Sequence, residues 1–288
     1  MLRSSVVRNA FLAAAAAAAW AAPLHGQLVR SASGTTAASI QPTLDLFRLD
    51  LGALNPNVAG SFGSGRREIN WDGVPDQFAA PNLLPPNFFN VNSPRGVVFG
   101  TPGTGVEVSA NAVNPTSTPV EFGNIDPTYP GIFAAFSPQR LFTGIGSNLV
   151  AVNFFVPGST GLATTRGFGV VFSDVDLASA TSLIFFDALD NFLGSFSAPA
   201  AVGDQTFSFL GVSFATAVIG RVLIVSGNTA LAAGVHEVPG LDLVAMDDFV
   251  YGEPLAVVPE PASLLLLGTG LAALGGLARR RRRPRREG

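Results

Sequence analysis

Six short segments between residues 167 and 253 restrict the fold of this chain more than any other feature. Each combines Phe, Val, Ile or Leu with small residues, and Gly, Asn, Asp or Pro separates it from the next. They are "GFGVVFSDVD" (167–176), "TSLIFFDA" (181–188), "NFLGSFSA" (191–198), "TFSFLGVSF" (206–214), "GRVLIVSG" (220–227) and "LVAMDDFVYGE" (243–253). Short strands with turn residues between them predict a mainly β fold, an antiparallel β-sandwich or jelly-roll-like body.

The sequence also predicts one central strand and one hairpin turn among these segments. Segment 206–214 carries bulky residues on both faces, which is typical of a central strand that is covered on both sides. Asp190 and Asn191 lie between two aromatic segments, and these residue types favour a hairpin turn.

The first part of the body is less regular. Residues 27–100 are rich in Asn, Pro, Gly and Ser, so we expect long loops with a few strands. The stretch "TLDLFRLDLGAL" (43–54) fits a short helix and a strand equally well. We therefore divide the body into a loop-rich N-terminal part, 27–100, and a β-sandwich domain, 101–256.

The charges of the body exclude one class of partner. Residues 27–258 hold 18 acids and 8 arginines, a net charge of −10, and the chain has no lysine. Such an acidic surface argues against nucleic acid. The chain also lacks cysteine, which excludes a disulfide, a thiolate nucleophile and a cysteine-based zinc site.

The N-terminus is typical of an export signal. Arg3 and Arg8 precede an apolar run from Ala10 to Ala22 that is too short to span a bilayer. Residues 1–26 therefore predict a signal peptide with an apolar helix, cleaved after Ala21 or after Gly26.

The C-terminus is typical of a membrane stop. The run from Ala262 to Ala278 is uncharged and just long enough for a thin bilayer as a helix. It is followed by five consecutive arginines, which the positive-inside rule keeps in the cytoplasm, together with residues 284–288. These residues are Arg279, Arg280, Arg281, Arg282 and Arg283. Signal and tail thus predict the same topology, with the body outside.

The triplet Pro259-Glu260-Pro261, the apolar helix and the arginine cluster together resemble the PEP-CTERM sorting signal of Gram-negative bacteria, over residues 257–283. The resemblance implies export, transient or permanent anchoring by the tail, and cleavage near the triplet by an exosortase-type enzyme in the membrane. It also implies a location at the cell surface or in the extracellular matrix. Segments 65–76 and 244–254 resemble stretches of uncharacterised exported bacterial proteins, which implies a shared domain but no activity.

Histidine catalysis has little basis in this sequence. His25 lies beside the predicted signal cleavage sites, and His236 lies in a loop of Gly, Ala and Pro. We assign no catalytic residue and no organic cofactor. Carboxylate pairs such as Asp187 with Asp190 could serve a carbohydrate-active hydrolase only if the fold placed them in a sugar cleft.

The carboxylates suit a structural Ca²⁺ better, because this cation binds several oxygens in irregular loops. Alternation along a strand places Asp174 and Asp176 on one face, and Asp247 and Asp248 on opposite faces. We therefore predict a Ca²⁺ site from Asp174, Asp176 and one of Asp247 or Asp248. Solvated turn carboxylates are the alternative.

The sequence favours a non-enzymatic exported protein that binds or structures exopolysaccharide, a link that rests on the kinship of this sorting class with exopolysaccharide production. The alternatives are a carbohydrate-active hydrolase and an adhesin or self-assembling surface subunit. The latter predicts an apolar patch or an open strand edge. The usual sugar-stacking residues of the body are few, namely Trp71, Tyr129 and Tyr251.

Overall fold

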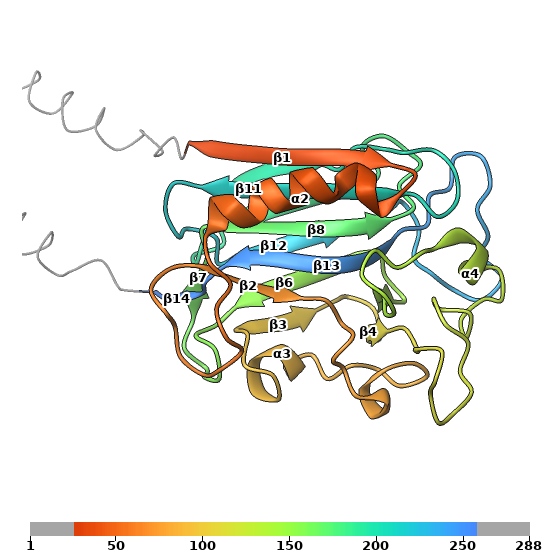
Figure 1. The fold of residues 1–288 in the computed structure, drawn as a ribbon, viewed down its shortest axis with the longest axis horizontal. Helices are drawn as coiled ribbons and strands as arrows, with labels where there is room; N and C mark the ends of the chain where they lie inside the picture. The colour runs from red at the N-terminus through yellow and green to blue at the C-terminus, as the bar shows by residue number, and fades with distance from the viewer. Residues whose placement is uncertain (1–25, 258–288) are drawn as a thin grey trace, which may run out of the picture.

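All six predicted segments form strands in the computed structural model, which describes residues 26–257 (Figure 1). Two antiparallel sheets pack against each other, and neither closes into a barrel in this part of the chain. The seven-stranded sheet contains β1 (Gln27–Gly34), β11 (Phe207–Phe214), β8 (Gly167–Ser173), β13 (Ala245–Gly252), β5 (Phe142–Ile145) and β4 (Gly105–Val108) in that order, with β2 (Arg66–Ile69) also paired to β13. The five-stranded sheet has the order β10 (Phe192–Ser197), β9 (Ser182–Phe186), β12 (Arg221–Val225), β6 (Leu149–Phe154) and β3 (Val97–Gly100). The mainly β, antiparallel fold class is confirmed.

The smaller elements close the ends and one face of this sandwich. A two-stranded sheet pairs β14 (Leu255–Ala256) with β7 (Ala163–Thr164). The helices are α2 (Ala37–Leu51), α3 (Phe88–Val91) and α4 (Tyr129–Ile132), with a 3₁₀ turn at Asp76–Phe78. None of the helices within residues 26–257 has the length and apolar character needed to cross a bilayer. The predicted signal helix and the predicted tail helix lie outside this range.

The N-terminal part contributes directly to both sheets. Strands β1 and β2 join the larger sheet, and β3 joins the smaller one. The ambiguous stretch 43–54 is mostly helical. Residues 43–51 form the greater part of α2, and the helix is capped by Gly52. Long irregular loops do occupy much of 52–96, as the composition predicts.

Helix α2 covers the outer face of the larger sheet (Figure 1). Its buried residues Ile40, Leu44, Phe47 and Leu51 recur at helical spacing and face the sheet. Phe47 fits over Gly169 and Gly211, which are paired across β8 and β11. A Cβ atom at either glycine would lie 2.8 Å from the Phe47 ring, so the close approach requires glycine there. Strand β11 is thereby buried along its whole length, as the sequence predicts for a central strand.

An aromatic cluster around Trp71 fills the space between the two sheets. The Trp71 ring stacks on Phe142 with centroids 4.1 Å apart, and the edges of Phe89 and Phe249 complete its surroundings. The indole N–H donates a hydrogen bond of 2.8 Å to the backbone carbonyl of Asp247. Aromatic contacts of this kind add to the area that each ring buries, so this cluster is a major source of the stability of the sandwich.

The strand register places the described ends of the chain far from one set of loops. Phe207, the first residue of β11, pairs with Ser173 at the end of β8, and Ser173 also pairs with Ala245 at the start of β13. Phe214, the last residue of β11, pairs with Gln27 at the start of β1. The start of β1 and strand β14 therefore mark one end of the sandwich, and the loops after Ser173 and before Ala245 mark the other (Figure 1).

Candidate functional site

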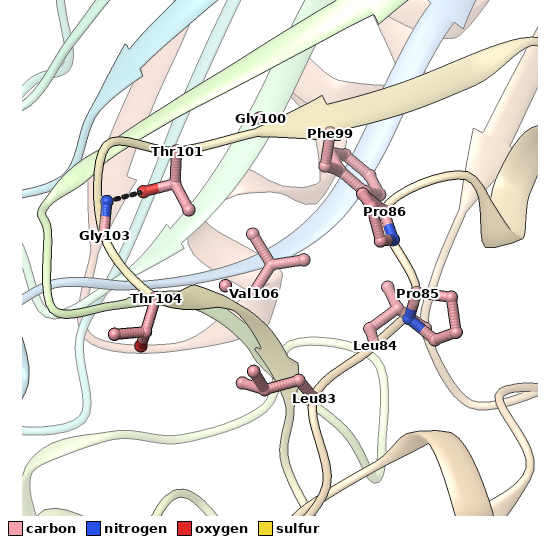
Figure 2. Close-up of a pocket in the computed structure, with 11 residues that line it drawn as sticks. Leu83, Leu84, Pro85, Pro86, Phe99, Gly100, Thr101, Gly103, Thr104 and Val106 are labelled. Atoms are coloured by element: carbon pink, nitrogen blue, oxygen red, sulfur yellow. Dashed lines mark hydrogen bonds between the residues drawn. The ribbon is translucent and has the colours of Figure 1, made fainter.

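An apolar pocket of about 420 Å³ lies between the 83–86 segment and the β3–β4 connection (Figure 2). Leu83, Pro86, Phe99 and Val106 line it, and the loop between β3 and β4 is held by a hydrogen bond from the Gly103 N–H to the Thr101 hydroxyl. No ionisable side chain lines this pocket. It can accept an apolar group but offers no acid or base for catalysis.

A second hollow, here called the Arg48 groove, has the opposite chemistry. Its volume is about 480 Å³, and amide, guanidinium and carboxylate side chains line most of it. The residues are Gln41, Arg48, Leu54, Asn55, Asn57, Glu68, Asn70, Arg95, Phe136, Ser137 and Asp248. Such a wall can donate and accept many hydrogen bonds at once.

Arg48 lies at the centre of this groove. It donates to both oxygens of Glu68, at 3.1 and 3.0 Å, and lies 3.5 Å from Asp248. Arg66 also donates to Glu68, at 2.6 Å. The two acids of the groove are therefore already engaged by guanidinium groups of the protein.

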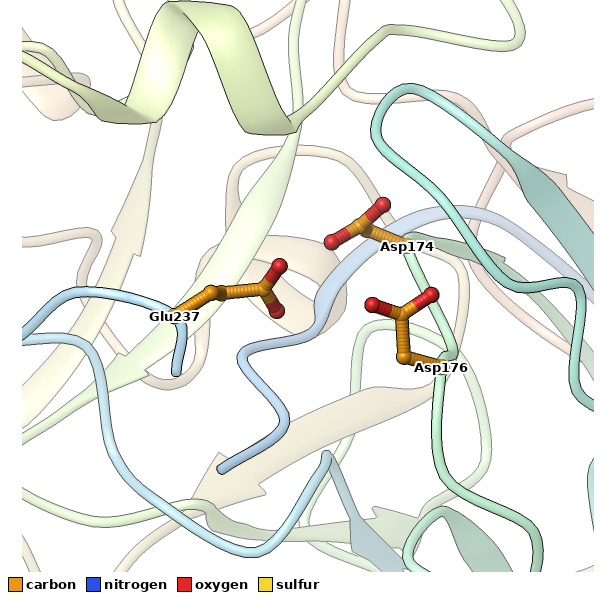
Figure 3. Close-up of side chains that lie close together, drawn as sticks. All are labelled: Asp174, Asp176 and Glu237. Carbon is orange, nitrogen blue, oxygen red and sulfur yellow. The ribbon is translucent and has the colours of Figure 1, made fainter. Parts of the chain in front are cut away.

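A cluster of three acids lies at the end of the sandwich opposite the start of β1 and strand β14. Asp174 and Asp176 follow β8, and Glu237 lies in the loop between β12 and β13. Figure 3 shows the three carboxyl groups turned toward one small space. One carboxylate oxygen from each residue lies within 4.8 Å of the others. We call these three residues the acidic cluster.

Asp174 is the interior member of the acidic cluster. Its side chain is completely buried, and neither carboxylate oxygen has a hydrogen-bond donor among the described residues. Burial, followed by the charges of Glu237 and Asp176, raises the pKa of Asp174 to about 9. The backbone φ of 70° at this residue is one that aspartate tolerates better than most residues, and it turns the chain directly after β8.

Hydrogen bonds fix the other two members and bring a fourth acid close. The Asp176 carboxylate accepts from the Gly203 N–H at 2.7 Å, and the Glu237 carboxylate accepts from the Leu243 N–H at 3.1 Å. Asp242 accepts from the Asp176 N–H at 2.9 Å, whereas its other oxygen is buried without a partner. Burial is the main cause that raises the pKa of both Glu237 and Asp242.

The structure places Asp247 and Asp248 apart from the acidic cluster. Both are buried in β13, and both accept from the Ser137 hydroxyl. The expectation that they point to opposite faces is wrong, because an irregularity in the β8–β13 register between Met246 and Phe249 interrupts the alternation there. Asp247 also accepts from the Phe136 N–H at 2.6 Å. Burial, followed by the charge of Asp248, raises the pKa of Asp247 well above its usual range.

The sequence did not associate Glu237 or Asp242 with Asp174. They are more than 60 positions away, in a loop that pattern analysis cannot place. The available signal was the occurrence of two acids within the short Gly/Pro loop "HEVPGLD" directly before a strand. The calcium site itself stays a prediction, now with a different set of neighbours around Asp174 and Asp176.

The candidate stacking residues and the loop histidine are placed clearly. Trp71, Tyr129 and Tyr251 are all buried, so none of them presents a ring to a ligand. His236 lies exposed in the β12–β13 loop, with its Nδ1 atom 3.6 Å from Asp126. The exposed aromatic rings of the described body include Phe62 and Phe192. Sugar stacking on Trp or Tyr therefore has no support from residues 26–257.

The predicted processing and topology residues lie outside the described range. They are Pro259, Glu260 and Pro261, and the arginines at 279–283. Residues 257–283 match the family model of the PEP-CTERM protein-sorting motif, which confirms the resemblance seen in the tail. Neither the curated proteins nor the solved structures contain a match to this chain. The likeness of segments 65–76 and 244–254 to other exported proteins thus stays a prediction.

Proposed function

We propose that this exported protein, which carries a PEP-CTERM sorting motif at residues 257–283, acts without catalysis at the cell surface or in the extracellular matrix, where it binds polysaccharide. The sorting motif is the observation that carries the proposal. It marks a protein that is secreted and then processed at its C-terminus by an exosortase-type enzyme. The location and the ligand are the proposed part.

The tail supplies the order of events in this proposal. The apolar run 262–278 holds the chain in the inner membrane after export, and Arg279–Arg283 keep the end of the tail inside. The triplet Pro259-Glu260-Pro261 is the sequence that the processing enzyme would recognise. Cleavage near the triplet releases the acidic body to the outside.

Mass spectrometry of the protein from its own host tests this order. The expected mature form lacks everything after about Pro259 and begins at Ala22 or Gln27. Replacing Glu260 with alanine should leave a membrane-retained precursor, whereas the matched change Glu287→Ala, beyond the motif, should leave processing intact. A surface-located wild-type protein that retains residues 262–283 would refute processing.

The Arg48 groove supports a polysaccharide as the ligand. A sugar chain offers many hydroxyl groups, and the groove offers amides, guanidinium groups and carboxylates that can pair with them. Phe136 adds one partly exposed ring beside these polar groups. Because binding would depend mainly on hydrogen bonds, we expect the groove to bind polysaccharide with modest affinity that several contacts share.

Binding of exopolysaccharide purified from the source organism tests the ligand. The double variant Asn57→Ala/Asn70→Ala removes two exposed amides from the groove and should weaken binding about tenfold or more, from roughly 1 kcal/mol for each lost pair of hydrogen bonds. The matched control Asn82→Ala/Asn92→Ala removes two exposed amides outside the groove and should leave binding unchanged. Equal binding by both double variants would exclude the groove.

A carbohydrate-active hydrolase is the second candidate, because Glu68 and Asp248 share the same groove. Paired carboxylates are the machinery of glycoside hydrolysis. Their contacts with Arg48 and Arg66 favour a structural role instead. Release of reducing ends from the same polysaccharide, abolished by Glu68→Gln or Asp248→Asn, would establish the hydrolase and overturn the non-catalytic proposal.

A self-assembling surface subunit is favoured by one further observation. In the described part of the chain β1 pairs only with β11, and Leu28 and Val29 on this strand are 43% and 42% exposed. An open strand edge with apolar side chains can pair with a second copy. Light scattering tests this through the molar mass in solution, because Val29→Lys should dissociate any oligomer that forms through β1.

A further inference from the structure

We infer that Asp174, Asp176 and Glu237 form a binding site for one divalent cation of the calcium type, which fastens the 228–243 loop to the end of β8. The sequence alone joined Asp174 and Asp176 to Asp247 or Asp248, whereas the geometry selects Glu237. The inference is independent of the proposed polysaccharide ligand, because the site and the Arg48 groove have no residue in common.

The buried Asp174 carboxylate is the first reason. It is completely removed from water, yet both of its oxygens lack a hydrogen-bond donor among the described residues, and one of them faces the space shared with Asp176 and Glu237 (Figure 3). A buried charge without a partner is strongly unfavourable, so folded proteins pair it, protonate it or bind a metal with it.

The charge balance around the cluster is the second reason. None of the ion pairs between described residues involves Asp174, Asp176, Glu237 or Asp242. A proton shared between two of these carboxyl groups would neutralise only one charge. A divalent cation neutralises two and provides a partner for the unpaired Asp174 carboxylate.

The possible ligand atoms and the distances between them identify the class of cation. All three ligand atoms are carboxylate oxygens from irregular loops, and oxygen is the ligand atom that a hard cation prefers. Two oxygens that bind one Ca²⁺ at its usual bond length can lie at most about 5 Å apart, and one oxygen from each acid lies within 4.8 Å of the others. Mg²⁺ demands shorter bonds and a stricter octahedron, so Ca²⁺ fits the loops better.

The site would join two regions of the chain. Asp174 and Asp176 are anchored through β8, and the loop of Glu237 is also held through Asn228, which donates to the Gly240 carbonyl at 2.9 Å. A cation between them therefore fixes the loop at the end of the sandwich opposite the start of β1.

Calcium binding to the full chain in detergent is the direct test. Equilibrium dialysis with radioactive Ca²⁺ should give one ion per chain, with half-saturation between about 0.1 and 1 mM, as in extracellular calcium modules. The melting temperature, followed by circular dichroism, should rise by about 5 °C in 10 mM CaCl₂ relative to EGTA, and less in MgCl₂.

Three substitutions locate the site. Asp174→Asn and Glu237→Gln should each abolish dialysis binding and the rise in melting temperature. Asp247→Asn is the matched control, a buried aspartate outside the acidic cluster, and should retain both. Glu237 is only half-buried, so its variant decides the matter even where Asp174→Asn does not fold.

Three results would overturn the inference. One is a wild-type chain that binds no Ca²⁺, which would leave the shared proton as the way the cluster is neutralised. Another is a calcium response that survives in both cluster variants. The third is a response that Asp247→Asn removes and the cluster variants retain, which would return the site to β13.

Discussion

Breaking the buried ion pair between Arg67 and Glu253 should destabilise the protein more than breaking any of the surface pairs between residues 26 and 257. Arg67 is completely buried, and its side chain is 2.8 and 2.9 Å from the two oxygens of Glu253. Its three remaining N–H groups donate to the carbonyls of Val58, Gly60 and Pro94. All five donors of the guanidinium are thus used, and the pair fastens an exposed loop to the last long strand of the body.

The change Arg67→Met keeps most of the side-chain volume and removes the charge. Glu253 then remains buried with only the Asn55 amide and the Phe62 N–H as donors. Removal of one partner from a buried pair costs about 3–5 kcal/mol, a large fraction of the roughly 5–15 kcal/mol that a domain has in total. The double variant Arg67→Met/Glu253→Gln removes the unpaired charge as well, so we expect it to recover at least about 1 kcal/mol.

Urea unfolding of the full chain with Trp20→Phe measures these changes, because Trp71 is then the only tryptophan and is buried in the core. Arg30→Met is the matched control, since Arg30 pairs with Asp50 at the partly exposed surface, where solvent screens the pair, and its loss should be clearly smaller than that of Arg67→Met. A loss below about 1 kcal/mol for Arg67→Met, or a loss equal to that of Arg30→Met, would refute the reasoning.

Three further changes test the packing and the buried acids. Gly211→Ala should cost about 1–3 kcal/mol in urea unfolding, because the new Cβ would meet the Phe47 ring at 2.8 Å, whereas Gly131→Ala, with open space around it, should change little. Trp71→Phe should cost about 2–4 kcal/mol, measured by circular dichroism, because it removes part of the stack on Phe142 and the indole hydrogen bond; a loss under about 0.5 kcal/mol would contradict the packing described. The raised pKa of Asp247 means that its folded form keeps a proton that the unfolded form loses near pH 4, so its contribution to stability falls as the pH rises above that value. Asp247→Asn should therefore reduce the loss of stability between pH 4.5 and pH 8, and parallel pH curves for the variant and the wild type would show that Asp247 ionises freely in the fold.

The regular part of this fold could be predicted because its residues carry local information. The alternation in 206–214 and the Asp190-Asn191 turn depend on neighbours in the chain, and both appear in the structure as a central strand and a hairpin. The stretch 43–54 could not be assigned, since its Leu-Asp-Leu alternation competes with the helical spacing of Leu44, Phe47 and Leu51. The glycines at 169 and 211 decide between them, because they form the surface that a helical Phe47 packs on.

Only part of the candidate site could be predicted from the sequence. Asp174 and Asp176 are neighbours in sequence, so their proximity needs no knowledge of the fold. Glu237 reaches them through the order of strands in the sheet, which no local pattern encodes. Asp247 and Asp248 were misjudged for a different reason, because the irregularity in β13 breaks the alternation on which the prediction depends.

The position of both described ends at one end of the sandwich determines what the body can reach. Strand β14 leads directly into residues 257–283, the segment that the sorting motif covers. An enzyme that binds this segment therefore binds the chain next to one end of the sandwich, here called a pole. The acidic cluster occupies the opposite pole, the length of an eight-residue strand away, or about 25 Å. The loops around Asp174 thus lie at the end of the described body opposite Val257, which leaves them open to the ions and polymers of the surroundings while the tail is still attached.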